Sequence, residues 1–170
     1  MTGALGAIVT ILVALNPPAV AARLGRIGSR VAGGLVLGAG IVAVISPLAS
    51  WLLGVLAVSE PTFRTAAGAV IGVNGLIHLA GGGAGRRDGH PPTVAALSVA
   101  SPAPVFAALA GTLDAGWPAT TAGLAAGVAA AVAPVWGDGE GPIVTWAVRM
   151  VGAVAVLAGL ALVIDGVSTV

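Results

Sequence analysis

The chain has 170 residues, of which 58% are hydrophobic and 8% are charged, and its net charge is +1. Soluble domains carry about a quarter charged residues, so this composition predicts an integral membrane protein. The low net charge, without a basic aromatic patch, gives no reason to expect nucleic-acid binding. The absence of cysteine excludes disulfides, thiol nucleophiles and thiolate metal sites.

Six apolar segments have about the 20 residues that a membrane span needs. In chain order they cover 3–27, 31–57, 62–82, 91–113, 117–137 and 144–168. The first begins without a basic region before it, so we interpret it as a span and not as a cleaved signal. The links are short and rich in glycine, proline or charge, which predicts a single integral membrane domain over 1–170.

The first and fourth segments each contain a proline that follows a small polar residue, Asn16-Pro17 and Ser101-Pro102. Asn and Ser are good helix N-caps and Pro is favoured at the first helical position, so a new helix is expected to begin inside each segment. A fresh N-terminus carries free N–H groups and a partial positive charge. Two such ends predict a midplane site for an anionic group such as a carboxylate. Plain proline kinks are the alternative.

The residues expected at this site are the two caps, the two prolines and two neighbouring alanines. They are Asn16, Pro17, Ala19, Ser101, Pro102 and Ala103. If they form a binding site, positions 19 and 103 should be accessible to water. If the breaks only shape helix packing, both positions should be inert.

Polar residues in the third and sixth segments are the next candidates. Arg64 and Arg149 each lie about one turn into their segment, where an arginine either braces helices and reaches the headgroups or contacts substrate as a gate. Glu60 lies four residues before Arg64, so a surface ion pair is a further alternative. Asn74 and His78 share a helix face at i,i+4. We expect Asn74 to bridge helices, and His78 either to relay a proton or to reach water or a carbonyl.

The two halves of the chain repeat at an offset of 85 residues. The matched pairs are Pro17 with Pro102, Gly38 with Gly123, Trp51 with Trp136, and Arg64 with Arg149. Because each half has three spans, the second half enters the membrane from the opposite side. The sequence therefore predicts an all-α bundle of six transmembrane helices, built from two inverted three-helix repeats of about 1–85 and 86–170, with spans 1 and 4 broken at midplane prolines.

Arginines in the links predict the orientation. The links after the first and third segments contain Arg23, Arg26, Arg30, Arg86 and Arg87. The links after the second and fourth contain Glu60 and Asp114 and no arginine, whereas the link after the fifth, with Asp138 and Glu140, gives no support. We expect the arginine-rich links, including loops 28–30 and 84–89, to be cytoplasmic and both termini to be extracytoplasmic. The Ala/Gly/Val/Arg bias points to a GC-rich bacterial genome and hence to a bacterial inner membrane.

Four segments resemble the MarC family of multi-pass membrane proteins. They are 8–27, an apolar run into Asn-Pro; 62–82, which opens on Phe-Arg; 95–106 around Ser101-Pro102; and 145–167, with Arg-x-x-Gly near its start. The resemblance implies a six-span inner-membrane protein of the LysE-type transporter superfamily, in which some members move small neutral amino acids. The family's glycines around the second proline are Ser101 and Ala103 in this chain, and Pro18 is an insertion after the first Asn-Pro.

These features favour transport over catalysis. The sequence has no Ser/His/Asp arrangement, His-Glu-x-x-His helix, pair of intramembrane carboxylates or phosphate loop, so we expect no enzyme, metal, cofactor or direct ATP coupling. The first hypothesis is a secondary transporter or exporter of a small anionic or zwitterionic metabolite, which works by alternating access. The alternative is a structural, accessory or lipid-handling membrane protein without solute transport.

The expected partners are a small-molecule substrate and membrane lipids. Glycine pairs at 34/38, 68/72 and 123/127 allow close helix approach, which we assign to internal packing, with a homo-oligomer interface as the alternative.

Overall fold

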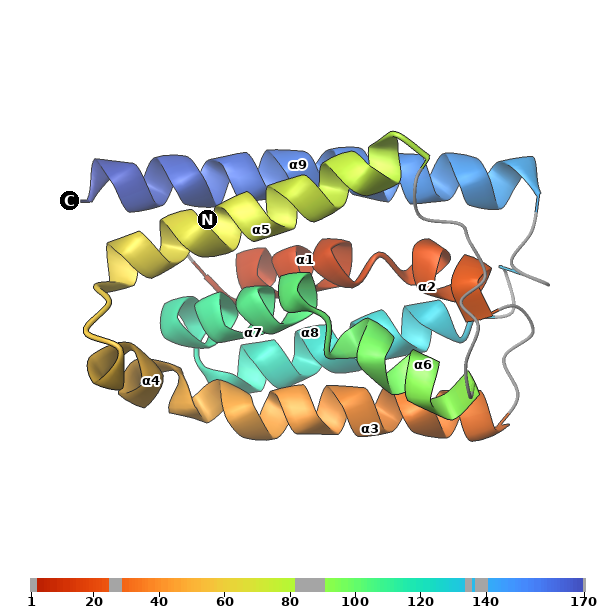
Figure 1. The fold of residues 1–170 in the computed structure, drawn as a ribbon, viewed down its shortest axis with the longest axis horizontal. Coiled ribbons are helices and arrows are strands. Elements are labelled where there is room, and N and C mark those ends of the chain that lie inside the picture. The colour runs from red at the N-terminus through yellow and green to blue at the C-terminus, as the bar shows by residue number, and fades with distance from the viewer. Residues whose placement is uncertain (1–2, 25–28, 82–90, 134–135, 137–140, 170) are drawn as a thin grey trace.

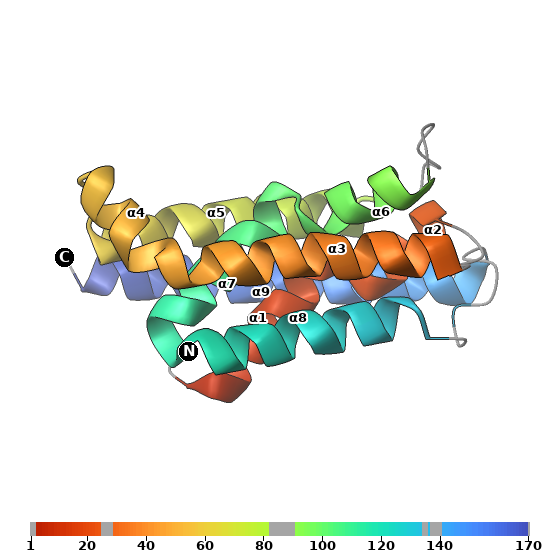
Figure 2. The same cartoon turned by 90° about the horizontal axis from the view of Figure 1, so that it is seen from below.

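The computed structural model describes residues 3–24, 29–81, 91–133, 136 and 141–169, and within these ranges it is helical with no strand. The helices are α1 (Ala4–Leu15), α2 (Pro17–Leu24), α3 (Ser29–Ile45), the 3-10 turn η1 (Ser46–Leu48), α4 (Ala49–Val55), α5 (Glu60–Leu79), α6 (Pro91–Val99), α7 (Pro102–Ala115), α8 (Trp117–Ala131) and α9 (Pro142–Ser168). Most of them run along the long axis of an elongated bundle (Figures 1 and 2). The all-α prediction is confirmed.

Three helical stretches are long and apolar enough to cross a membrane, namely Ala4–Leu24, Ser29–Val55 and Pro142–Ser168. Helices α6 and α7, bent by 44° at their junction, form a fourth if they count as one span. Helix α8 has 15 residues, about 22 Å at about 1.5 Å per residue, which is short of the ~30 Å hydrocarbon core. Helix α5 is more polar than these helical stretches and is not among those apolar enough to cross a membrane. Three or four spans are thus supported, and six stays a prediction.

Both predicted helix breaks are present. Helix α1 ends at Leu15 and α2 begins at Pro17, while α6 ends at Val99 and α7 begins at Pro102. Figure 1 shows both breaks well away from the two ends of the bundle. The new helix begins at the proline in each case, as expected from the preference of proline for the first helical position.

Helices α5 and α9 lie side by side and antiparallel, with their backbones in contact through glycine (Figure 1). A Cβ atom on Gly159 would lie 2.5 Å from the carbonyl oxygen of Gly68, and one on Gly75 would lie 2.6 Å from that of Gly152. Only glycine permits this approach, as in other close membrane helix pairs. Glycine therefore serves internal packing here, as expected.

Two further helix contacts use matched positions of the two halves. A Cβ on Gly38 of α3 would lie 2.5 Å from the carbonyl oxygen of Ala96 in α6. A Cβ on Gly123 of α8 would lie 3.1 Å from Cδ1 of Ile11 in α1. At the offset of 85 residues, Gly38 corresponds to Gly123 and Ala96 to Ile11. The α3–α6 and α8–α1 contacts each join one half to the other, and the repeat relates them to one another.

The centre of the bundle is apolar and so is much of its outer surface. The fully buried large side chains include Ile11, Leu35, Ile71 and Leu124 from four different helices. Large apolar side chains such as Val44, Trp51 and Leu157 are more than half exposed. This distribution is typical of a helical protein whose outer surface contacts lipid.

Part of the predicted topology cannot be compared with these helices. Arg26, Arg86, Arg87, loop 84–89, Asp138 and Glu140 lie outside the described residues.

Candidate functional site

At the first break, Asn16 joins two helices. Its backbone adopts the left-handed conformation (φ 47°), which a short polar side chain tolerates, and its N–H still donates to Leu12 at the end of α1. Its Oδ1 accepts a hydrogen bond from the Ala19 N–H at 3.3 Å, so the predicted N-cap of α2 is confirmed. Its Nδ2 donates to the carbonyl oxygen of Val148 in α9 at 3.2 Å. Asn16 is fully buried.

The first turn of α2 has no free N–H group, contrary to expectation. Pro17 and Pro18 lack one. The N–H groups of Ala19 and Val20 both donate to the carbonyl oxygen of Asn16, at 2.8 and 3.1 Å. Ala19 is 1% exposed and packs in an apolar cluster instead of facing water. Pro18 removes the donor that a single proline would have left.

At the second break, Ser101 occupies the N-cap position of α7 but makes no capping hydrogen bond. An N-cap side chain accepts from the second or third helical N–H, and the third residue here is Pro104, which has none. The Ser101 hydroxyl donates to the carbonyl oxygen of Ser98 at 2.9 Å instead. The cap prediction is wrong for this side chain. The N–H of Ala103 has no hydrogen-bond acceptor among the described residues.

A groove of about 420 Å³ lies between α5 and the start of α7, and we call it the α5–α7 groove. Its lining residues are Ala69, Val70, Val73, Asn74, Ile77, Ser101, Pro102 and Ala103. The structure thus brings Ser101, Pro102 and Ala103 together with Asn74. Asn16, Pro17 and Ala19 do not line this groove and are buried in the bundle.

Asn74 connects the groove to the first break. Its Nδ2 donates to the carbonyl oxygen of Ala14 at 3.4 Å. Ala14 lies in the last turn of α1, where carbonyl groups lack a partner within the helix. The prediction that Asn74 bridges helices is confirmed, and its Oδ1 remains an acceptor beside the groove.

His78 is buried where α5 contacts α9, and it is 3% exposed. A Cβ on Gly152 of α9 would lie 3.1 Å from the His78 Cβ. The Nδ1 atom has no hydrogen-bond partner among the described groups, so this nitrogen reaches neither a carbonyl nor bulk water. His78 does not line the groove, and proton relay stays a prediction.

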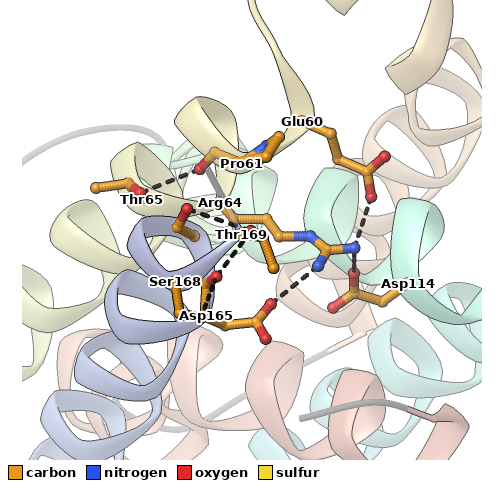
Figure 3. A network of polar contacts seen from close by, with 9 residues as sticks. Glu60, Pro61, Arg64, Thr65, Asp114, Asp165, Ser168 and Thr169 are labelled. Carbon is orange, nitrogen blue, oxygen red and sulfur yellow. Dashed lines mark hydrogen bonds and ion pairs between the residues drawn. The ribbon is translucent and has the colours of Figure 1, made fainter.

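Arg64 forms the largest group of ion pairs in the described residues, shown in Figure 3. One guanidinium nitrogen, Nη2, lies 2.6 Å from Glu60 and 2.6 Å from Asp114 of α7. The other, Nη1, lies 2.9 Å from Asp165 of α9. The predicted pair with Glu60 is confirmed, and Arg64 also braces three helices.

Sequence reasoning did not connect Asp114 and Asp165 with Arg64. A signal was available, because an arginine one turn inside a span needs a counter-charge. In the inverted repeat, the start of the third span and the ends of the fourth and sixth lie on one side of the membrane. Carboxylates at those three ends were therefore candidates for a shared partner.

Arg149 has different surroundings from Arg64, its match in the repeat. It is exposed, and it forms no ion pair with any described residue. A Cβ on Gly81, just after the end of α5, would lie 3.2 Å from the Arg149 Nη2. The two arginines occupy equivalent places across the α5–α9 pair, but within the described parts of the chain only Arg64 has carboxylates at ion-pair distance.

No protein-family model, curated protein or solved structure matches this chain. The functional argument therefore depends on the groove, the breaks and the ion pairs, and the resemblance to MarC proteins depends on the four sequence segments alone.

Proposed function

We propose that the protein is a secondary transporter or exporter of a small anionic or zwitterionic metabolite, with small neutral amino acids as the favoured class. In this proposal, six spans form two inverted repeats in a bacterial inner membrane, MarC-like in organisation, with both termini outside. The observation that carries the proposal is the second helix break. It brings Ala103, which is 3% exposed and whose N–H has no acceptor among the described residues, to the wall of a groove of about 420 Å³.

Chemistry at the groove suits a small carboxylate. The Ala103 N–H lies in the first turn of α7, a helix of 14 residues whose N-terminal partial charge is positive. A bound carboxylate would accept from this N–H. The Ser101 hydroxyl donates its hydrogen bond to the Ser98 carbonyl oxygen, so its oxygen and the Asn74 Oδ1 act as acceptors and would bind an ammonium group. The groove volume lies within the usual range for ligand pockets, about 300–1,000 Å³.

Alternating access is supported by the way the halves pack. The α3–α6 contact at Gly38 and the α8–α1 contact at Gly123 join matched positions. Helix breaks also occur at matched positions, Pro17 and Pro102. Both contacts join one half to the other and are related by the repeat, as expected of two units that move against one another around a central site. The first turn of α2 has no free N–H donor, so substrate would bind at the second break.

A tryptophan at Val73 should abolish transport. Val73 lines the groove and is 56% exposed, so an indole there fills the groove without disturbing the core. Leu76→Trp is the matched control, because Leu76 is 53% exposed on the same helix and is not a lining residue. An untargeted metabolite export screen, comparing cells with and without the protein, identifies the substrate class. If Val73→Trp exports as well as Leu76→Trp, the groove is not the transport site.

A lipid-handling role is the second candidate, favoured by the apolar walls of the groove. Ala69, Val70, Val73 and Ile77 form most of its α5 side, and Ile77 is 48% exposed. An acyl chain would fit against such walls.

Labelling of a single cysteine separates the two candidates, because the chain has no native cysteine. Transport predicts that Val73→Cys reacts with a charged, membrane-impermeant maleimide. Lipid binding predicts reaction only with a lipid-soluble maleimide. Val44→Cys, at a 74% exposed apolar position of α3, reports the behaviour of a purely lipid-facing site.

A further inference from the structure

Proline at each helix break leaves a carbonyl oxygen without its usual backbone partner. In an α-helix the carbonyl oxygen of one residue accepts from the N–H four residues later, and proline has no N–H. Pro102 therefore provides no donor for the Ser98 carbonyl in the last turn of α6. Pro18 provides none for the Ala14 carbonyl in the last turn of α1. Both carbonyl oxygens need a donor from another group, because an unpaired one inside the bundle is costly.

Two side chains supply the missing donors. The Ser101 hydroxyl donates to the Ser98 carbonyl oxygen at 2.9 Å. The Asn74 Nδ2 donates to the Ala14 carbonyl oxygen at 3.4 Å. Because a carbonyl oxygen can only accept, Ser101 uses its one proton in this bond, and Asn74 turns the nitrogen end of its amide toward α1. Each side chain keeps its own oxygen, Oγ of Ser101 and Oδ1 of Asn74, for a further partner.

Both side chains belong to the walls of the α5–α7 groove. Ser101 and Asn74 are the polar residues of its lining, and the other six lining side chains are apolar. None of the eight is ionisable. The polar groups that the lining residues offer are therefore two side-chain acceptors and one donor, the Ala103 N–H. A ligand that fits this set has an acceptor group next to a group with at least two protons to donate.

We propose that Ser101 and Asn74 make the groove selective for 2-amino acids over the 2-oxo acids of the same carbon skeleton. This inference rests on the proposed function, in which the ligand carboxylate accepts from the Ala103 N–H. The neighbouring ammonium group has three protons and donates to both acceptors. A 2-hydroxy group has one proton and satisfies one of them. A 2-oxo group has none, so it brings a third oxygen against the two acceptors and leaves both unpaired.

The selectivity is tested by titrating the full-length protein in lipid nanodiscs with L-alanine and L-valine, each compared with its 2-hydroxy and 2-oxo acid. The three compounds of a set share the carboxylate and the carbon skeleton, so differences in Kd report the second group alone. We expect the 2-amino acid to bind about ten- to a hundredfold more tightly than the 2-oxo acid, with the 2-hydroxy acid between them, because each unpaired acceptor loses a hydrogen bond. Ser101→Ala removes one acceptor and should lower this ratio about three- to tenfold.

Ser98→Ala is the matched control for Ser101→Ala. The Ser98 hydroxyl is buried, bonds within α6 and does not line the groove, while its carbonyl stays in place for Ser101. This variant should leave the ratio unchanged. Asn74→Leu removes the second acceptor and should lower both the ratio and the melting temperature, since the Ala14 carbonyl loses its donor.

The outcomes separate selectivity from simple bracing of the breaks. If Ser101→Ala and Asn74→Leu lower the melting temperature but not the ratio, both residues only brace the breaks and the inference is wrong. Equal Kd values for the amino and oxo acids, both weakened by Val73→Trp, would overturn the selectivity and leave the groove as the binding site. If none of the compounds binds, or if Val73→Trp does not weaken their binding, the inference and the proposed function both fail.

Discussion

Replacing Gly159 by leucine should prevent stable folding, and even Gly159→Ala should lower the melting temperature in detergent markedly. A Cβ there would lie 2.5 Å from the Gly68 carbonyl oxygen and 2.6 Å from the Gly72 nitrogen. Both atoms belong to the backbone, so no side chain can rotate away. Overpacking costs about 1–3 kcal/mol where side chains can adjust, and we expect at least the upper end here. The two longest helices of the bundle would have to separate.

Gly72→Ala is the matched control for this prediction. Gly72 lies on α5 at the same crossing point, but a Cβ on Gly72 meets no atom within 4 Å. Alanine is a better helix former than glycine by about 0.5–1 kcal/mol, so Gly72→Ala should leave the melting temperature unchanged or raise it. Equal melting temperatures for Gly159→Ala and Gly72→Ala would show that the α5–α9 contact is looser than described. A thermal melt of each variant in one detergent is sufficient.

Much of the fold could be predicted from sequence because membrane helices have strong signals. Apolar length predicted the helical stretches, and proline after a cap residue predicted both breaks. Glycine spacing predicted the close helix contacts. The length of α8 was overestimated, since it ends at Ala131 and not at residue 137. Apolar composition alone does not mark where a helix stops, and Ala133-Pro134 follows soon after.

Less of the candidate site could be predicted, because the site depends on which backbone N–H groups are left without an acceptor. Symmetry suggested that the helix N-termini at the two prolines contribute equally to one midplane anion site. Pro18 and Pro104 break that symmetry: the first consumes a donor beside Asn16, and the second removes the donor that Ser101 would have capped. Both effects follow from the missing proline N–H and were readable in the sequence. The contact between Arg64 and Asp165, 101 residues apart, required the packing of α5 on α9.

Asn16→Asp should destabilise the protein more than Asn16→Ala. Aspartate keeps the acceptor for the Ala19 N–H, but it replaces the Nδ2 that donates to Val148 with an oxygen facing a carbonyl oxygen. Asn16 is 0% exposed, so the carboxylate is either a buried, repelled charge or a protonated acid. Desolvating the charge costs several kcal/mol and repulsion from the Val148 carbonyl adds to it, so we expect a cost of at least about 5 kcal/mol. Alanine loses two hydrogen bonds of about 1 kcal/mol each and adds about 1–2 kcal/mol of left-handed strain at φ 47°.

The ranking of these two variants separates the contact with α9 from helix capping. If Asn16 served only as the cap of α2, aspartate would be as good as asparagine and would favour the helix dipole, so the order would reverse. Ser101→Asp is the control, because the Ser101 side chain caps nothing and lies beside the groove. Melting temperatures of Asn16→Ala and Asn16→Asp in detergent decide the question. An aspartate variant that melts at or above the alanine variant would mean that an oxygen facing the Val148 carbonyl costs less than the lost cap and the left-handed strain of alanine. Export by Ser101→Asp, measured in parallel, reports the effect of a negative charge at the groove itself. Loss of export in Asn16→Asp follows instead from misfolding, and not from repulsion of substrate.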